Sequence, residues 1–146
     1  ALGINLVKNW TDETFAEKAT SALEKIQAVL PETLLHDMEQ LATHSVTSQA
    51  KIPWKVSFSD IRECIRKKQK IAFGYTDLNE KNSKRTVRPL ALTFFGPVWL
   101  VTAWCEKRKD FRNFRLDRMK ELKLAGIHFR DEKGKSLQDY LDQVWD

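Results

Sequence analysis

Hydrophobic positions in the first third of the chain recur at helical spacing. In residues 12–31, "DETFAEKATSALEKIQAVLP", the apolar positions fall three and four residues apart, which predicts an amphipathic helix. Asp12 is placed to cap the start of this helix, and Pro31 ends it and can open a second helix with an apolar stripe over 34–41. These stripes predict core or dimer contacts. The opening "ALGINLVKNW" resembles the later turns of a helix, so we expect the chain to be a fragment of a longer protein.

From Ser57 onward the pattern changes to one short helix followed by β signals. The stretch "SFSDIRECIRKKQK" predicts a helix capped by Ser57 or Ser59, with Ile61, Cys64 and Ile65 facing inward. Short runs rich in β-branched and aromatic residues then predict strands at 71–75, 85–95, 98–105, 111–116 and 121–129.

Turn and breaker residues separate these strands. "TDLNEKNSK" is a polar hairpin loop, Pro89 predicts a bulge or an edge position, Gly96-Pro97 predicts a tight turn, and "EKRKD" is a charged turn. "SLQDYLDQVW" predicts a closing amphipathic helix. One helix before about five short antiparallel strands is typical of a small barrel.

The predicted fold class is therefore α+β: an N-terminal helical segment, a small Sm-like or SH3-like five-stranded antiparallel β-barrel, and a C-terminal helix. The polar, Pro-containing linker "THSVTSQAKIPW" marks the boundary, so we expect a helical linker or dimerisation segment over 1–50 and a second domain over 51–146.

Charge is distributed unevenly along the chain, although the net value is only +5. Residues 1–61 carry 5 Lys/Arg against 8 Asp/Glu, residues 62–123 carry 17 against 7, and residues 124–146 carry 3 against 5. The positive charge is local and rich in arginine, which favours a specific anionic partner. A basic surface with no ligand is the plain alternative.

The sequence offers few candidates for a catalytic or metal-binding site. His36, His44 and His128 are scattered, and no glycine-rich phosphate loop or nucleophile elbow is present. We therefore predict no enzyme, no metal and no cofactor. Cys64 and Cys105 lie far apart among apolar neighbours, which is typical of buried thiols in a reducing cytoplasm. No apolar run approaches the ~20 residues that span a bilayer, so no membrane partner is predicted.

The most informative stretch is 110–119, "DFRNFRLDRM". Read as a strand, it places Arg112, Phe114, Leu116 and Arg118 on one face and Asn113, Arg115 and Asp117 on the other. A buried arginine needs a carboxylate, water or an anion as partner. Local acids can compensate some of these charges, and the others predict a phosphate-binding and base-stacking surface.

The succession "VRPLALTFFGPVWLVTAWCEKRKDFRNFRLDRM" resembles the WYL domain, the regulatory module of YafY-like, DeoR-type bacterial transcription regulators, from about residue 57 to residue 124. The helical part with "ALEKIQAVLP" is similar to the linker that follows the winged helix-turn-helix in those proteins. The Trp-Tyr-Leu triplet that names the family stands here as Trp99-Leu100-Val101, so the family's tyrosine is missing.

The resemblance implies an effector-sensing, cytoplasmic regulatory domain that binds an anionic ligand, single-stranded nucleic acid or a nucleotide, and signals to a winged helix-turn-helix absent from this sequence. It also implies a homodimer that reaches operator DNA only through that missing domain. A structural dimerisation module and a general Sm-like single-stranded RNA-binding protein remain alternatives. The ligand contacts carried over by position are Tyr75, Arg85, Arg88, Trp99, Arg112, Phe114, Arg115 and Arg118.

Overall fold

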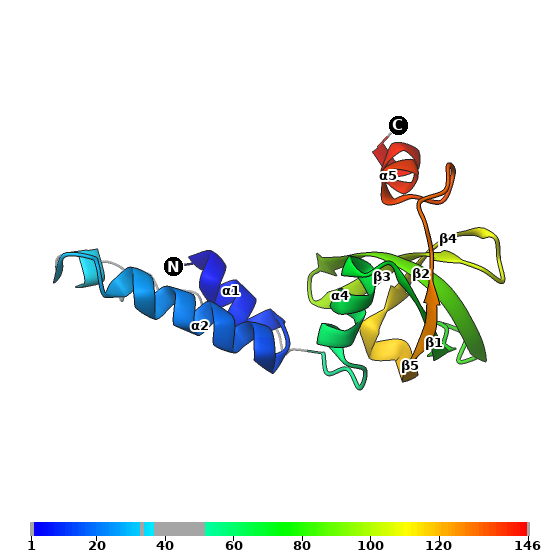
Figure 1. Cartoon of the computed structure of the whole chain (residues 1–146). Helices are drawn as coiled ribbons and strands as arrows, with labels where there is room; N and C mark the ends of the chain where they lie inside the picture. Colours follow the sequence, from blue (N-terminus) through cyan, green and yellow to red (C-terminus); the bar gives the residue numbers. More distant parts are fainter. Residues whose placement is uncertain (1, 33, 37–51, 146) are drawn as a thin grey trace. The chain divides into compact units, whose positions relative to one another are not determined.

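The structure, a computed structural model, describes residues 2–32, 34–36 and 52–145. The chain divides into two compact units, Ala1–Lys51 and Ile52–Asp146, and each is described by itself. Figure 1 traces both units along the sequence.

The first unit consists of helices. α1 spans Leu2–Trp10 and α2 spans Glu13–Gln27. The predicted cap is confirmed, because the Asp12 carboxylate accepts a hydrogen bond from the Phe15 N–H at 3.0 Å. Residues 34–36 are helical, and the rest of the second predicted helix lies outside the described residues. None of the side chains described on α2 is fully buried within this unit. Phe15 and Ala19 are half-buried, whereas Ile26 is 45% exposed.

The second unit begins with helix α4, Phe58–Arg66, which packs on the sheet through Phe58, Ile61 and Cys64. Ser57 is the cap, since its hydroxyl accepts a hydrogen bond from the Asp60 N–H at 3.1 Å. The strands are β1 (Gln69–Thr76), β2 (Asn82–Phe95), β3 (Val98–Cys105), β4 (Asp110–Arg115) and β5 (Met119–His128). All five predicted strands are thus present.

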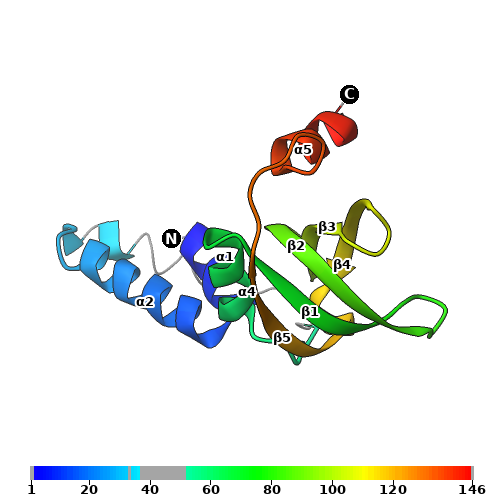
Figure 2. The same ribbon diagram turned by 45° about the vertical axis from the view of Figure 1, so that its right-hand side comes forward.

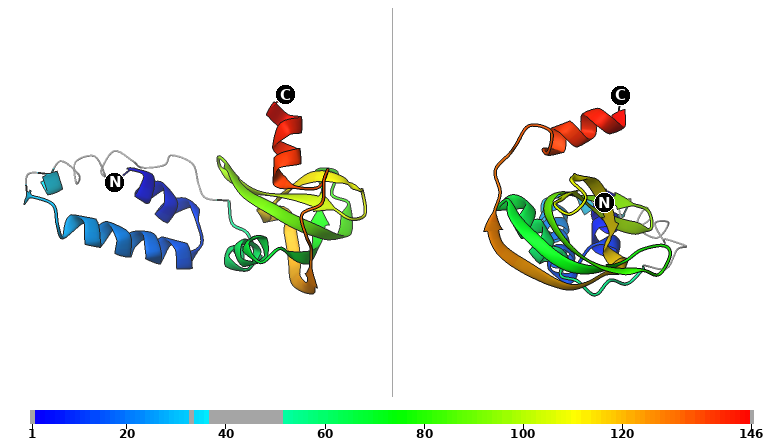
Figure 3. Two further views of the ribbon diagram at one scale, coloured as in Figure 1. Left: turned by 45° about the horizontal axis from the view of Figure 1, so that its top comes forward. Right: turned by 90° about the vertical axis from the view of Figure 1, so that its right-hand side faces the viewer.

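The strands form one antiparallel sheet in the order β4-β3-β2-β1-β5. The α+β class is confirmed, but the sheet is open: among the described strands, β4 and β5 are its two edges and do not pair. Only the three residues Leu116–Arg118 join these edges, so the sheet must curl until they approach at that corner, as its strong curvature in Figure 3 illustrates.

Two irregularities shape this sheet. The register of β2 against β3 shifts between Pro89 and Ala91, which confirms the bulge predicted at the proline. The stretch 110–119 is not one strand as the sequence predicted. β4 ends at Arg115, and a 3-10 turn follows over Leu116–Arg118. Leu116, only 1% exposed, holds this turn in the core, which overrides the β pattern.

The core lies on the concave side of the curled sheet, under α4. It is formed by residues from every strand together with the helix, among them Ile61, Ile71, Val87, Val101 and Met119. Both cysteines are fully buried there as free thiols. Burial raises the pKa of the Cys64 thiol, with Asp60 and Glu63 adding to the effect.

A C-terminal strap of residues 129–136 leads from β5 to helix α5, Leu137–Trp145, which stands beyond the sheet at the end of the strap in Figure 2. Tyr140 on α5 packs against Phe111 and accepts a hydrogen bond from the Asn113 amide at 2.8 Å. Helix α5 therefore contacts the outer face of β4. No described helix is both long enough and apolar enough to cross a membrane.

Candidate anion-binding site

The inner face of β1 and β2 carries the first part of the candidate site. Cross-strand partners share a face, and the register pairs Phe73 with Arg85 and Tyr75 with Ser83. Phe73 is buried at 3% exposure, so the Arg85 side chain starts on the core side of the sheet. The guanidinium of an arginine at this position needs hydrogen-bond acceptors, although its surroundings are largely apolar.

Three aromatic rings pack together next to the β1 position that pairs with Arg85. Phe114 on β4 packs edge-on against Phe73 and Tyr75, with ring centroids 5.2 and 5.1 Å apart. The Tyr75 hydroxyl accepts a hydrogen bond from the backbone N–H of Arg115 at 3.3 Å. Tyr75 thus ties the end of β1 to the end of β4, and it is only partly buried.

Arg118 approaches the same region from the 3-10 turn. Its Nη1 donates to the backbone carbonyl of Asp77 at 2.8 Å, two residues beyond Tyr75. Met119, the next residue, pairs with Tyr75 across β1 and β5. Arg85 therefore lies opposite Phe73, two residues before Tyr75, and Arg118 binds the backbone two residues after it.

Three buried guanidinium nitrogens in this region have no acceptor among the described residues: Nε and Nη1 of Arg85 and Nε of Arg118. A buried donor without a partner costs about 1–3 kcal/mol, and more when the group is charged. We call Tyr75, Arg85, Phe114 and Arg118 the inner arginine site. Its chemistry suits an anion that supplies the missing acceptors.

Two of the predicted arginines are already paired with neighbouring acids. The Arg115 guanidinium binds Asp117 through two hydrogen bonds of 3.1 and 2.9 Å, and its pKa is raised chiefly by this contact. Arg112 pairs with Asp110 at 3.0 Å, with both side chains 53% exposed. The backbone N–H of Arg115 also contacts the inner arginine site, through the Tyr75 hydroxyl.

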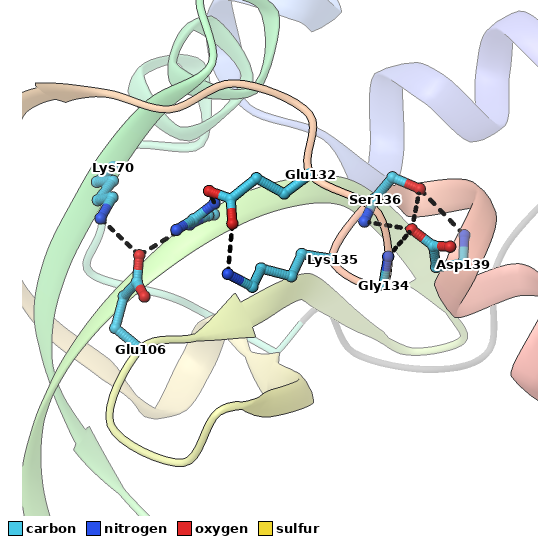
Figure 4. A network of polar contacts seen from close by, with 8 residues as sticks. Lys70, Glu106, Glu132, Gly134, Lys135, Ser136 and Asp139 are labelled. Carbon is cyan, nitrogen blue, oxygen red and sulfur yellow. Dashed lines mark hydrogen bonds and ion pairs between the residues drawn. The ribbon is translucent and has the colours of Figure 1, made fainter.

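Arg88 lies on the opposite face from Arg85, since odd and even positions of β2 alternate. Its Nε donates to Glu106 at 2.8 Å and its Nη1 to Glu132 at 2.5 Å, while Lys70 also pairs with Glu106 and Lys135 with Glu132. Figure 4 shows Lys70, Glu106, Glu132 and Lys135 meeting between the sheet and the strap. Arg88 therefore fastens the strap to β2.

The carboxylates of this network are held in their charged form. Hydrogen bonds from Lys135 and Arg88 lower the pKa of Glu132 from 4.5 to about 2. Burial acts to raise the pKa of Glu106, but its contacts with Lys70 and Arg88 outweigh burial and lower it. The pKa of Arg88 is raised, because its two carboxylate partners outweigh the opposing effect of burial.

Trp99 lies in a different part of the inner face. Its ring packs on Phe58 of α4 with centroids 4.9 Å apart, and on Phe94 at 5.2 Å. It therefore belongs to the contact between α4 and the β2–β3 hairpin. Leu100 is adjacent to the inward-facing Val101 and so points to the other face of β3.

Sequence reasoning did not identify Glu106 and Glu132 as partners of Arg88. They lie 18 and 44 residues from it, and no local pattern links them to it. Among the described residues, no group of three or more His, Cys, Asp or Glu side chains could hold a metal ion. His128 contacts the Lys67 carbonyl through Nδ1 at 3.0 Å, and His44 lies outside the described residues.

Comparison with known proteins supports the resemblance seen in the sequence. Residues 57–124 match the family model described as "WYL domain". The chain is 35% identical over 69 residues to the DNA-binding transcriptional repressor CapW of Escherichia coli strain KTE188, an alignment covering 47% of this chain and 23% of CapW. It is 28% identical over 107 residues to the uncharacterized HTH-type transcriptional regulator YobV of Bacillus subtilis strain 168, covering 70% of this chain and 34% of YobV.

The chain thus spans between about a quarter and a third of the length of these relatives. Among solved structures, the proteasome accessory factor B/C (PafBC) of Arthrobacter aurescens is 26% identical, with a TM-score of 0.46, over 55% of this chain and 15% of that protein.

Proposed function

Residues 57–124 form a WYL domain, and from this premise we propose that the protein is the effector-sensing regulatory part of a bacterial transcriptional regulator. It binds an anionic ligand, single-stranded DNA or a nucleotide, at the inner arginine site. A separate winged helix-turn-helix domain of the full-length regulator contacts operator DNA. The relatives named above support the regulatory role, since they are transcriptional regulators.

The single observation that carries the ligand proposal is the set of buried, unpaired nitrogens on Arg85 and Arg118. Elsewhere in the described part of the chain, Arg88, Arg112 and Arg115 have carboxylate partners. The protein's own acids therefore compensate these three arginines and leave the inner pair with donors to spare. A phosphate offers several acceptors to such donors, and the partly exposed Tyr75 ring offers a base a surface for stacking.

The helical unit has a proposed role in assembly and signalling. Apolar side chains along and after α2 are exposed within their own unit, with Ile26 at 45%, Val29 at 81% and Leu34 at 48%. A second copy of the chain would cover such a stripe in a homodimer. Paired helices of this kind would link the effector domain to the DNA-binding domain.

A structural module without a ligand is the second candidate, and the ion pairs favour it for three of the eight predicted residues. In that case Arg85 and Arg118 would contribute only to folding. Their replacement would lower stability, and the wild-type chain would bind no nucleotide.

Titration of the 146-residue chain with a mononucleotide, dTMP, and with a short oligothymidylate tests the proposal. We expect binding that weakens steeply with salt, because phosphate contacts release counterions. Arg85→Gln and Arg118→Gln should each weaken binding about 10- to 100-fold, since each removes charge-assisted hydrogen bonds. Arg112→Gln is the matched control and should bind as the wild type does.

Two results would reject the proposal. One is an affinity that is equal at low and high salt. The other is a loss of affinity in Arg112→Gln as large as in the two inner variants, because binding would then reflect total charge and not the inner arginine site.

A further inference from the structure

On its outer face, β1 carries two small residues, Ala72 and Gly74. Ala72 and Gly74 point away from the core there, because they alternate with the inward-facing Ile71 and Phe73. Gly74 has no side chain, and a Cβ added to it would first meet the backbone oxygen of Lys120, at 3.7 Å. The outer surface of the sheet is therefore recessed at Gly74, where no side chain covers the backbone.

Lysines from the two neighbouring strands flank this recessed part of β1. Gly74 pairs with Lys84 on β2 and with Lys120 on β5, and Ala72 pairs with Lys123 on β5. Adjacent strands lie about 4.8 Å apart, so the backbones of Lys84 and Lys120 are about 10 Å apart across β1. All three lysines are exposed, and none forms an ion pair with a described residue.

Two hollows occupy this region, with volumes of about 450 and 190 Å³. Gly74, Lys84 and Glu121 line both, so the two hollows are adjacent. Lys120 lines the larger hollow, and Lys123 and Arg85 line the smaller one. Glu121, at a bulge of β5 with φ 50°, is the one carboxylate among the lining residues, and it too has no ion pair with a described residue.

We propose that this lysine groove, formed by Gly74, Lys84, Lys120 and Lys123, binds the phosphodiester backbone of an extended single-stranded nucleic acid lying along β1. The inference rests on the proposed function for its class of ligand, but it assigns a second site on the other face of the sheet. A narrow recess with lysines on both sides fits one phosphodiester strand, because lysines from β2 and from β5 can both contact its phosphates.

The groove should discriminate between an oligonucleotide and a mononucleotide. An oligothymidylate of about 12 nucleotides would occupy both sites, whereas dTMP would occupy only the inner arginine site. Lys84→Gln, Lys120→Gln and Lys123→Gln should each weaken oligothymidylate binding by about two- to fivefold and reduce the salt slope by about 0.7. None of the three should change the affinity for dTMP.

Two further variants make the test specific. Glu121→Gln removes the carboxylate from the groove and should strengthen oligothymidylate binding, which a purely structural role would not predict. Lys109→Gln, in the β3–β4 turn away from β5, removes one exposed positive charge and should leave binding unchanged.

Several outcomes would overturn the inference while leaving the proposed function intact. These are an oligothymidylate that binds no more tightly than dTMP, lysine variants that behave like Lys109→Gln, and an oligoglutamate of matched length that competes equally well. If the wild type binds neither dTMP nor oligothymidylate, the proposed function fails together with the inference.

Discussion

Replacement of Arg88 by methionine should destabilise the second unit without affecting ligand binding. The Arg88 side chain is 10% exposed and donates to Glu106 and Glu132, whose side chains are 30% and 47% exposed. Methionine keeps much of the volume of the arginine stem but removes both charge-assisted hydrogen bonds and the guanidinium that lies 5.9 Å from the centre of the Phe129 ring.

The expected loss of stability depends on the two carboxylates, Glu106 and Glu132, that lose Arg88 as a partner. A hydrogen bond to a charged group contributes about 1.5–3 kcal/mol. Screening at the partly exposed carboxylates reduces this figure, and Lys70 and Lys135 still pair with Glu106 and Glu132 after the substitution. We therefore expect a loss of about 2 kcal/mol in the free energy of unfolding, which lowers the Tm of a domain of this size by about 10 °C.

Chemical denaturation of the wild type, Arg88→Met and Arg112→Met measures this difference. The Arg112–Asp110 pair is half exposed, so its loss should change stability by no more than about 0.5 kcal/mol. The reasoning would be refuted if Arg88→Met unfolded at the same denaturant concentration as Arg112→Met. It would also be refuted if folded Arg88→Met lost affinity for dTMP, since Arg88 would then contact the ligand.

Three further predictions concern acid stability, thiol reactivity and the cost of the inner arginine site. The pKa of Glu132 is lowered to about 2, so its stabilising effect is complete above its ordinary value of 4.5 and is lost as the pH falls towards 2. Glu132→Gln should therefore flatten the decline of Tm over this range, and an unchanged decline would contradict it. Cys64 and Cys105 are fully buried, so a thiol reagent should modify them only in denaturant, and rapid reaction of the native chain would contradict the fold. Arg85→Met should keep or raise the Tm, because it removes buried unpaired donors, and a clear drop in Tm would favour a structural role.

Local patterns predicted the elements that depend on local chemistry. Asp12 and Ser57 cap their helices because each side chain reaches an N–H three residues away. The bulge at Pro89 follows from the missing N–H, which cannot join a regular ladder.

Features that depend on distant residues could not be predicted in this way. The alternation along 110–119 suggested one strand, but the buried Leu116 and the Arg115–Asp117 pair accompany a 3-10 turn there. Glu132, which pairs with Arg88, comes from the strap 44 residues further along the chain, so no local pattern links the two residues. The lysine groove likewise arises only because β1 pairs with both β2 and β5.

The most direct test of the inner arginine site follows the arginine side chains themselves. In the chain labelled with ¹⁵N-arginine, the Nε–H signals can be recorded by NMR while dTMP is added. We predict that the signals of Arg85 and Arg118 shift, because their Nε–H groups gain an acceptor. The Arg88 signal should not move, because its Nε–H group stays bound to Glu106. Unchanged Arg85 and Arg118 signals at saturating dTMP, or a shift of Arg88 alone, would contradict it.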